Sequence, residues 1–144
     1  MQHPAHVSPH LTLYRKALYC AAMAKRDPLG LLPLTPQMLH VLLALADGDK
    51  HGYAIIKEVL RRTGGDVVLG AGTLYALVKR MLGEGMILET EERPDISLDD
   101  ERRRYYRLTP FGRAVAVAEV NRLESIVDQA RAKRLIKGLR PQRG

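Results

Sequence analysis

The chain has 144 residues, the usual length of a single domain with room for one core. It carries 23 Lys and Arg against 16 Asp and Glu, a formal net charge of +7, which makes a polyanionic partner such as nucleic acid worth considering. Its single cysteine, Cys20, excludes an internal disulfide and a thiolate metal cluster, and no apolar stretch approaches the roughly 20 residues of a membrane span, so we expect a cytoplasmic protein without metal or cofactor.

The N-terminal residues are predicted to lie outside the main core. Residues 1–10 contain histidines and prolines without apolar periodicity, which predicts a disordered tail. Residues 11–33 are expected to hold a short helix and a connector. Leu11, Tyr14 and Leu18 recur at helical spacing in the first part, and Pro and Gly break any helix in "DPLGLLPL".

Residues 34–109 are expected to form one compact unit that begins with three helices. Thr35 and Pro36 have the composition of an N-cap and a first helical residue, and the helix that they begin stops at the turn "DGDK". The second helix should run from about His51 to Arg62 and end at "TGG", where glycine suits the C-cap. Its apolar spacing predicts four buried side chains: Tyr53, Ile56, Val59 and Leu60.

The third helix is predicted from the segment "LGAG" to about Glu84, before Gly85. A dinucleotide-binding loop would need glycine where Tyr75 stands, and a phosphate loop would need Lys followed by Ser or Thr, so neither nucleotide motif is present. On a helical wheel one face is apolar and must be the buried one. Its members are Leu74, Leu77, Val78, Met81 and Leu82.

The opposite face of the third helix suits a DNA major groove. Its centre carries small residues such as Ala76, which let the backbone approach a surface, and hydroxyls and cations at the edges can reach phosphates and base edges. A solvated helix face has a similar composition, so amphipathicity alone leaves both interpretations open. The residues that we assign to DNA contact are Gly72, Thr73, Tyr75, Lys79 and Arg80, with Tyr75 on a phosphate or a thymine methyl.

Beyond Gly85 the composition changes to that of strands. "MILETEE" and "RRYYRLT" flank the polar loop "RPDISLDDE", which predicts a two-stranded hairpin with a long tip, and "DVVL" is a candidate for a short third strand. Three helices followed by a hairpin make a winged helix-turn-helix, a mainly α fold with a small β-hairpin. Alternation in the second strand points Arg103, Tyr105 and Arg107 outward as candidates for phosphate contact.

The predicted tip of the hairpin is acidic, which opposes DNA binding. Residues 89–101 hold seven Asp and Glu side chains against Arg93 alone, and DNA would repel them. We expect the tip to bend away from DNA or to pair with the adjacent arginines. Pairing of Arg102, Arg103 and Arg104 within the chain is the alternative to phosphate contact.

A long last helix is predicted from Pro110 to about Lys137, capped by Thr109 and closed by Gly138. We assign residues 110–138 to dimerisation and residues 139–144 to a basic tail. Along the helix an apolar row alternates steps of four and three residues, the spacing by which two helices pair. The predicted dimerisation residues are Leu11, Tyr14, Leu18, Ala116, Val120, Leu123, Val127 and Ala130.

Four segments together resemble the PadR family of bacterial transcriptional regulators. They are "LTPQMLHVLLALADG" (34–48), "HGYAIIKEV" (51–59), "GAGTLYALVKRMLGEGMI" (70–87) and "DERRRYYRLTPFG" (100–112). The resemblance implies a homodimeric winged-helix repressor that binds a palindromic operator in double-stranded DNA and is released by a small-molecule effector. Relatives often have proline where this chain has Ala71, a change of small expected cost because alanine is a good helix former.

The sequence is also compatible with other classes of function. A winged-helix module that binds proteins and has lost operator binding is the main alternative, supported by the acidic tip. An enzyme is not expected, because no nucleophile lies in a recognisable motif and no His and carboxylate cluster has metal-ligand spacing. Neither the effector nor the residues that bind it can be named from the sequence, and His40 and His51 are interpreted as structural side chains.

Overall fold

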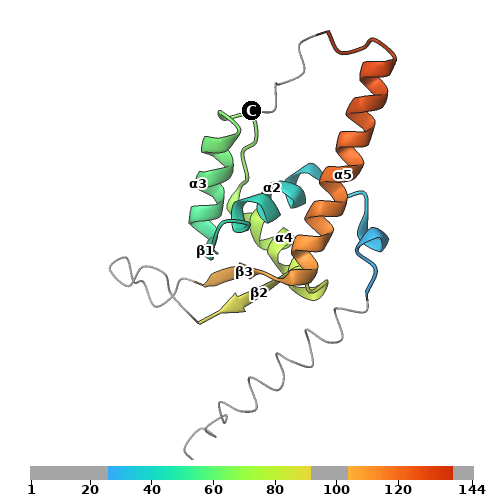
Figure 1. Ribbon diagram of the computed structural model, residues 1–144. Helices are drawn as coiled ribbons and strands as arrows, with labels where there is room; N and C mark the ends of the chain where they lie inside the picture. Colours follow the sequence, from blue (N-terminus) through green and yellow to red (C-terminus); the bar gives the residue numbers. More distant parts are fainter. Residues whose placement is uncertain (1–25, 92–103, 138–144) are drawn as a thin grey trace, which may run out of the picture.

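The computed structural model describes residues 26–91 and 104–137 and has the architecture of a winged helix-turn-helix extended by one long helix (Figure 1). Several expectations lie outside these residues, namely those for the N-terminal tail and helix with Leu11, Tyr14 and Leu18, most of the acidic tip, Arg103 and the basic tail. The described elements are η1 (Pro28–Leu31), α2 (Pro36–Leu45), β1 (Lys50–His51), α3 (Gly52–Arg62), α4 (Ala71–Gly83), β2 (Ile87–Thr90), β3 (Tyr105–Leu108) and α5 (Pro110–Ala132).

Two helices begin with the same Thr-Pro cap, as predicted. Thr35 Oγ1 accepts a hydrogen bond from the Met38 backbone N–H at 3.2 Å, and Thr109 Oγ1 accepts one from Gly112 at 2.9 Å. In each case proline follows at the first helical position, where the missing N–H costs nothing. The short caps therefore fix the starts of α2 and α5 from local sequence alone.

The C-terminal ends of α3, α4 and α5 each have a left-handed residue, which after α4 is Gly85 with φ 74°. Gly64 follows α3 with φ 60°, and the next N–H, of Gly65, donates to the carbonyl of Leu60 at 2.9 Å. The same motif closes α5, but there Arg134 takes the left-handed position with φ 61°. The prediction that α5 continues to Lys137 is wrong, because this turn ends the helix at Ala132.

The core lies where α2, α3, α4 and the first part of α5 meet the sheet. Its fully buried side chains come from all of these elements and include Val41, Leu42, Ile55, Val59, Met81, Met86 and Val115. The predicted buried face of α3 is wrong in part: Tyr53 is 60% exposed and Leu60 is 42% exposed. The predicted burial of Val59 is confirmed and Ile56 is partly buried, whereas Ile55, one turn from Val59 on the same face, is buried in place of Tyr53 and Leu60.

The sheet has three strands in the order β1-β3-β2, with β3 antiparallel to both neighbours. β2 and β3 are the two strands of the expected hairpin, paired from Ile87 with Leu108 to Thr90 with Tyr105. The third strand is Lys50–His51 and not "DVVL", which connects α3 to α4 without strand pairing. None of the described helices is long and apolar enough to cross a membrane.

β3 is covered on both faces, which changes the expected orientation of one side chain. His51 of β1 lies opposite Tyr105, and the edge of one ring meets the face of the other with centroids 5.4 Å apart. Tyr105 and its neighbour Tyr106 are therefore both buried, at 6% and 4% exposure. The prediction that Tyr105 points outward is wrong, because β1 adds a cover that the alternation of β3 alone does not reveal.

Candidate nucleic-acid interface

α4 presents the face that the sequence singled out. Leu74, Val78 and Met81 are buried against the core, as predicted, and this anchors the helix with its opposite side outward. All five residues assigned to DNA contact on this helix are exposed: Gly72, Thr73, Tyr75, Lys79 and Arg80. Tyr75 is 62% exposed although it is a large aromatic side chain. The helix thus offers one continuous outward surface.

The small residue at the start of this surface has no packing role in the described structure. A Cβ atom placed on Gly72 would meet no heavy atom within 4 Å. Glycine weakens a helix relative to alanine by roughly 0.5–1 kcal/mol, so internal stability does not explain it. A close approach of another molecule to the helix backbone would explain the glycine.

The cations of α4 have no internal partner among the residues that the structure describes. The side chains of Lys79 and Arg80 form no hydrogen bond or ion pair there, whereas Arg26, Arg62, Arg107, Arg113, Arg122 and Arg131 all do. Two positive charges beside small residues, unpaired within the described part of the chain, form a surface suited to phosphate oxygens.

The first turn of α3 lies next to the first turn of α4. A Cβ on Gly52 would come within 3.3 Å of the Leu74 side chain, so the two helices touch there. His51 caps α3 by accepting the Ala54 N–H on Nδ1 at 3.1 Å, which is a structural role as expected. Tyr53 is exposed, and the Lys57 ammonium lies 5.2 Å from the centre of its ring. Sequence reasoning missed this pair because it placed Tyr53 in the core.

The wing cations are engaged within the chain. Arg107 donates from Nε and Nη2 to the Asp49 carboxylate at 3.1 and 2.7 Å. Arg104 pairs with Glu89 across the hairpin at 3.6 Å. With Tyr105 buried, the described part of the wing therefore offers phosphates only arginines that already have acidic partners.

His40 is a partnered side chain of α2, in agreement with its predicted structural role. Arg62 donates to the His40 carbonyl oxygen at 3.0 Å, and its guanidinium lies 3.3 Å from Nδ1. Partial burial, and then the charge of Arg62, lower the pKa of His40. Within residues 26–91 and 104–137 no group of three His, Cys, Asp or Glu side chains is placed to hold a metal ion.

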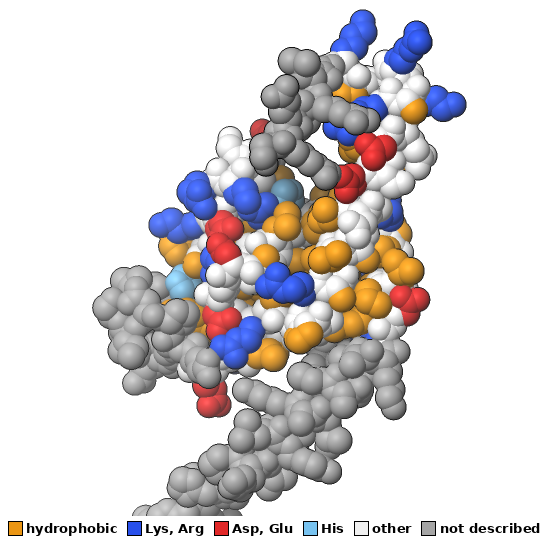
Figure 2. Space-filling view, viewed as in Figure 1, with side chains coloured by type: hydrophobic (Ala, Val, Ile, Leu, Met, Phe, Trp, Pro, Cys, Tyr) orange, Lys and Arg blue, Asp and Glu red, His pale blue; other side chains and the backbone are white. Residues whose placement is uncertain are grey.

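α5 carries an apolar row whose three larger side chains remain exposed in the described protomer. Val120, Leu123 and Val127 are 43%, 38% and 38% exposed, and Ala116 and Ala130 are partly buried. Figure 1 shows the second half of α5 rising clear of the other described elements, and Figure 2 shows hydrophobic side chains gathered around its lower half. The residues keep the four-and-three spacing of paired helices.

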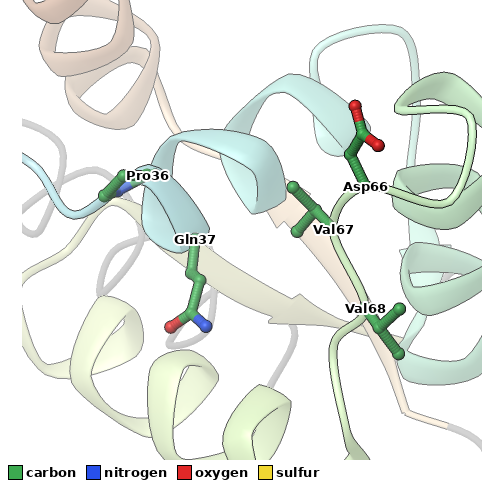
Figure 3. Close-up of a pocket in the computed structure, with 5 residues that line it drawn as sticks. All are labelled: Pro36, Gln37, Asp66, Val67 and Val68. Carbon is green, nitrogen blue, oxygen red and sulfur yellow. The ribbon is translucent and has the colours of Figure 1, made fainter.

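A pocket of about 420 Å³ lies between the first turn of α2 and the segment that leads into α4. Figure 3 shows Gln37 reaching from α2 and the valines 67 and 68 from the connecting segment. The remaining lining residues are Pro36 and Asp66. The pocket thus adjoins the segment that positions α4, but its lining carries no convergent set of polar groups that would name a ligand.

Comparison with known proteins places this architecture in a family. The transcriptional regulator PadR-like family matches residues 41–118, more than half of the chain. The chain is 36% identical over 88 residues to the transcriptional regulator Rv3488 of Mycobacterium tuberculosis. The matched region covers 61% of this chain and 76% of that protein.

Solved structures agree with the sequence comparison. A transcriptional regulator from Clostridium thermocellum, Cth-833, superposes with a TM-score of 0.56 and 26% identity over 69% of this chain and 92% of its own. A PadR family transcription regulator from Clostridium difficile R20291 gives a TM-score of 0.56 and 26% identity over 66% of this chain and 94% of its own. Members of the PadR-like family are transcriptional regulators and not enzymes. The winged helix, the exposed α4 and these matches together show that the chain belongs to the PadR-like family of DNA-binding transcriptional regulators.

Proposed function

We propose that this regulator is a homodimeric repressor that reads a palindromic operator with α4 and is released by a small-molecule effector. The observation that carries the proposal is the outward face of α4, where Lys79 and Arg80 have no partner among the described residues and Gly72 leaves open space. A recognition helix needs small residues near the groove floor and donors at its edges. The proposed direct contacts are Gly72, Thr73, Tyr75, Lys79 and Arg80.

Tyr53 and Lys57 extend this surface onto α3. Both are exposed, and their helix begins beside the first turn of α4. In a helix-turn-helix the helix before the recognition helix crosses the DNA backbone. We therefore assign the Tyr53 hydroxyl and the Lys57 ammonium to phosphate contacts that position α4 without reading sequence.

The wing would contribute less than α4. A phosphate reaching Arg107 must compete with Asp49, which already binds the guanidinium through two nitrogens. Arg103, Tyr105 and Arg107 were the predicted wing contacts. Of these, Arg103 lies outside the described residues and Tyr105 is buried, which leaves Arg107 as a secondary contact in the proposal.

The dimer would form through the row on α5. Two copies that pair by Ala116, Val120, Leu123, Val127 and Ala130 remove three half-exposed apolar side chains per protomer from water. A twofold axis between the helices places the two α4 helices in successive major grooves, with half-sites about 34 Å apart. An effector that changes the angle between the protomers would break this spacing and release the operator, and we expect this to take place in the cytoplasm.

The test is a pair of single substitutions on α4. In Lys79→Ala and Arg80→Ala we expect operator affinity to fall roughly tenfold each, with the slope of log affinity against log salt reduced by about 1 for a lost phosphate contact. The matched control is Lys133→Ala, an exposed cation beyond the end of α5. Sedimentation should show an unchanged dimer in all three. Wild-type affinity in both α4 variants would overturn the assignment of that helix.

A protein-binding module without operator binding is the second candidate. It is favoured by the internal pairing of Arg104 with Glu89 and of Arg107 with Asp49, which removes cations from the wing. A discrete footprint on genomic DNA supports the repressor. Capture of one defined protein partner by the purified chain, together with no footprint, supports the module.

A further inference from the structure

Glu119 is a buried carboxylate in the middle of α5. Its exposure is 1%, and it is the one charged side chain among the buried residues that the structure describes. An ionised group that is removed from water costs several kcal/mol unless partners replace the water. Its position therefore demands specific contacts.

Those contacts come from two different elements. Arg122, one turn further along α5, donates from Nε to one carboxylate oxygen at 2.8 Å and from Nη2 to the other at 2.7 Å. The backbone of Leu34 also lies beside the carboxylate, and its N–H helps to lower the pKa of Glu119. Leu34 directly precedes Thr35, the N-cap of α2, so the contact with Leu34 joins α5 to the start of α2.

Glu119 also marks the point at which α5 leaves the domain. Phe111, Gly112, Val115 and Glu119 are its buried residues, and residues 120–132 contain none. This projecting part is roughly 20 Å long at 1.5 Å per residue. A tilt of about 10° at Glu119 would move its far end by roughly 3 Å, close to the rise of one base pair when 10 pairs span about 34 Å.

We infer that Glu119 is a positioning residue that sets the spacing between the two operator half-sites, because its buried carboxylate, held by Arg122 and lying against the Leu34 backbone, fixes the direction in which the projecting part of α5 leaves the winged domain. The inference rests on the proposed function in one respect, namely that α5 pairs two copies on DNA. Apolar packing at Phe111 and Val115 is not directional, whereas a buried carboxylate held by two nitrogens of one arginine has a defined orientation. A buried polar group that fixes register at some cost in stability is a known use of such groups.

The variants are Glu119→Gln, which keeps the volume and removes the charge, and Glu119→Ala, which removes the carboxylate and its contacts altogether. The matched control is Asp128→Asn. Asp128 forms the same acid and arginine pair three residues apart on the same helix, with Arg131 at 2.9 Å, but it lies exposed in the projecting part. Thermal unfolding identifies any variant that fails to fold, and Glu119→Gln keeps the test decisive if Glu119→Ala does.

The first measurement needs no DNA. In a Cys20→Ser background, spin labels at Leu60→Cys on α3 and Gln129→Cys on α5 report the distance between domain and projecting helix, with labelled chains diluted in unlabelled protein so that only distances within one protomer count. We expect a narrow distribution in the parent and in Asp128→Asn, and a clearly broader or shifted one in both Glu119 variants. Identical distributions in all folded proteins would overturn the inference.

The second measurement uses operators whose half-sites are moved apart or together by one or two base pairs. The parent and Asp128→Asn should lose roughly tenfold or more in affinity on the altered spacings, the effect of about 1.4 kcal/mol. The Glu119 variants should discriminate less than about threefold, with half-site affinity unchanged. Retained discrimination in a folded Glu119 variant contradicts the inference and leaves the repressor intact. Failure of the parent to bind any two-part operator contradicts the proposed function, and the distance measurement then decides the role of Glu119 alone.

Discussion

Gly112 lies where the first turn of α5 crosses the backbone of Met86, the residue before β2, and no larger residue fits there. A Cβ on Gly112 would lie 1.9 Å from the Met86 carbonyl oxygen and 2.7 Å from its carbon. The Thr109 hydroxyl bonds that same carbonyl at 2.9 Å, and the Thr109 N–H reaches it at 3.1 Å, so neither backbone can retreat without losing these bonds. The segment "TPFG" thus locks α5 to the wing.

We predict that Gly112→Ala lowers the free energy of unfolding by on the order of 3 kcal/mol, the upper part of the range for overpacking. Urea denaturation followed by circular dichroism measures it. Gly83→Ala is the control, since it makes the same change in a helix where a Cβ meets nothing within 4 Å, and it should stabilise slightly. Equal stability of Gly112→Ala and the parent would show that the crossing is looser than these distances require.

Glu119 makes stability depend on pH in a defined direction. The Arg122 hydrogen bonds, with support from the Leu34 N–H, hold the pKa of the Glu119 carboxyl below its usual range in the folded state. A lowered folded-state pKa contributes stability that is complete above the ordinary pKa of Glu and is lost as the pH falls through the folded value. We predict that Glu119→Gln has a lower free energy of unfolding than the parent at pH 7. The difference between the two free energies should narrow below about pH 4. Urea titrations at stepped pH check this, and a gap that widens on acidification would contradict it.

α4 is the element at which stability and DNA binding make opposite demands. Gly72→Ala should raise helix stability by about 1 kcal/mol, because alanine is the better helix former and a Cβ there meets no atom of the described structure. It should also lower operator affinity severalfold, because the added methyl stands between backbone and groove. Thermal unfolding and gel shift on the same samples separate the two effects. Higher stability with unchanged affinity would instead identify the surface as an ordinary solvated helix face.

The elements differ in how far local sequence specifies them. The Thr-Pro caps, the glycine ends of α3 and α4 and the buried stripe of α4 follow from neighbours a few residues apart, and their predictions are confirmed. The predicted buried face of α3 is wrong in part because Tyr53 and Leu60 border the apolar stripe, and only the contacts with α2 and α4 select Ile55 beside the correctly predicted Val59.

The errors in the wing have a second cause. β1 contains only Lys50 and His51, too few residues to show any periodicity, yet its pairing with β3 buries Tyr105 and brings Asp49 to Arg107. Partners 58 residues apart leave no local signal. The outward face of α4 was predictable because burial of one side of a helix leaves the opposite side exposed. The ion pairing of each wing arginine was not predictable in the same way.

At the scale of the whole molecule, the remaining question is what covers the row on α5. Leu123 is 38% exposed and stands at the centre of the row, beyond the last residue that α5 buries in its own domain. Its replacement by a charged residue should therefore leave the protomer folded. In a paired helix the same charge would be forced into an apolar seam, at a cost of several kcal/mol unless it is neutralised or paired.

We predict that Leu123→Asp shifts the protein from dimer to monomer in sedimentation at micromolar concentration and abolishes binding to a two-part operator while weak half-site binding persists. Val117→Asp is the control, because Val117 is exposed at 54% on the same helix but lies off the row. It should sediment and bind as the parent does. A dimer of unchanged stability in Leu123→Asp would exclude pairing through α5, and because half-site spacing depends on that pairing, the protomers would then have to reach successive grooves through another surface.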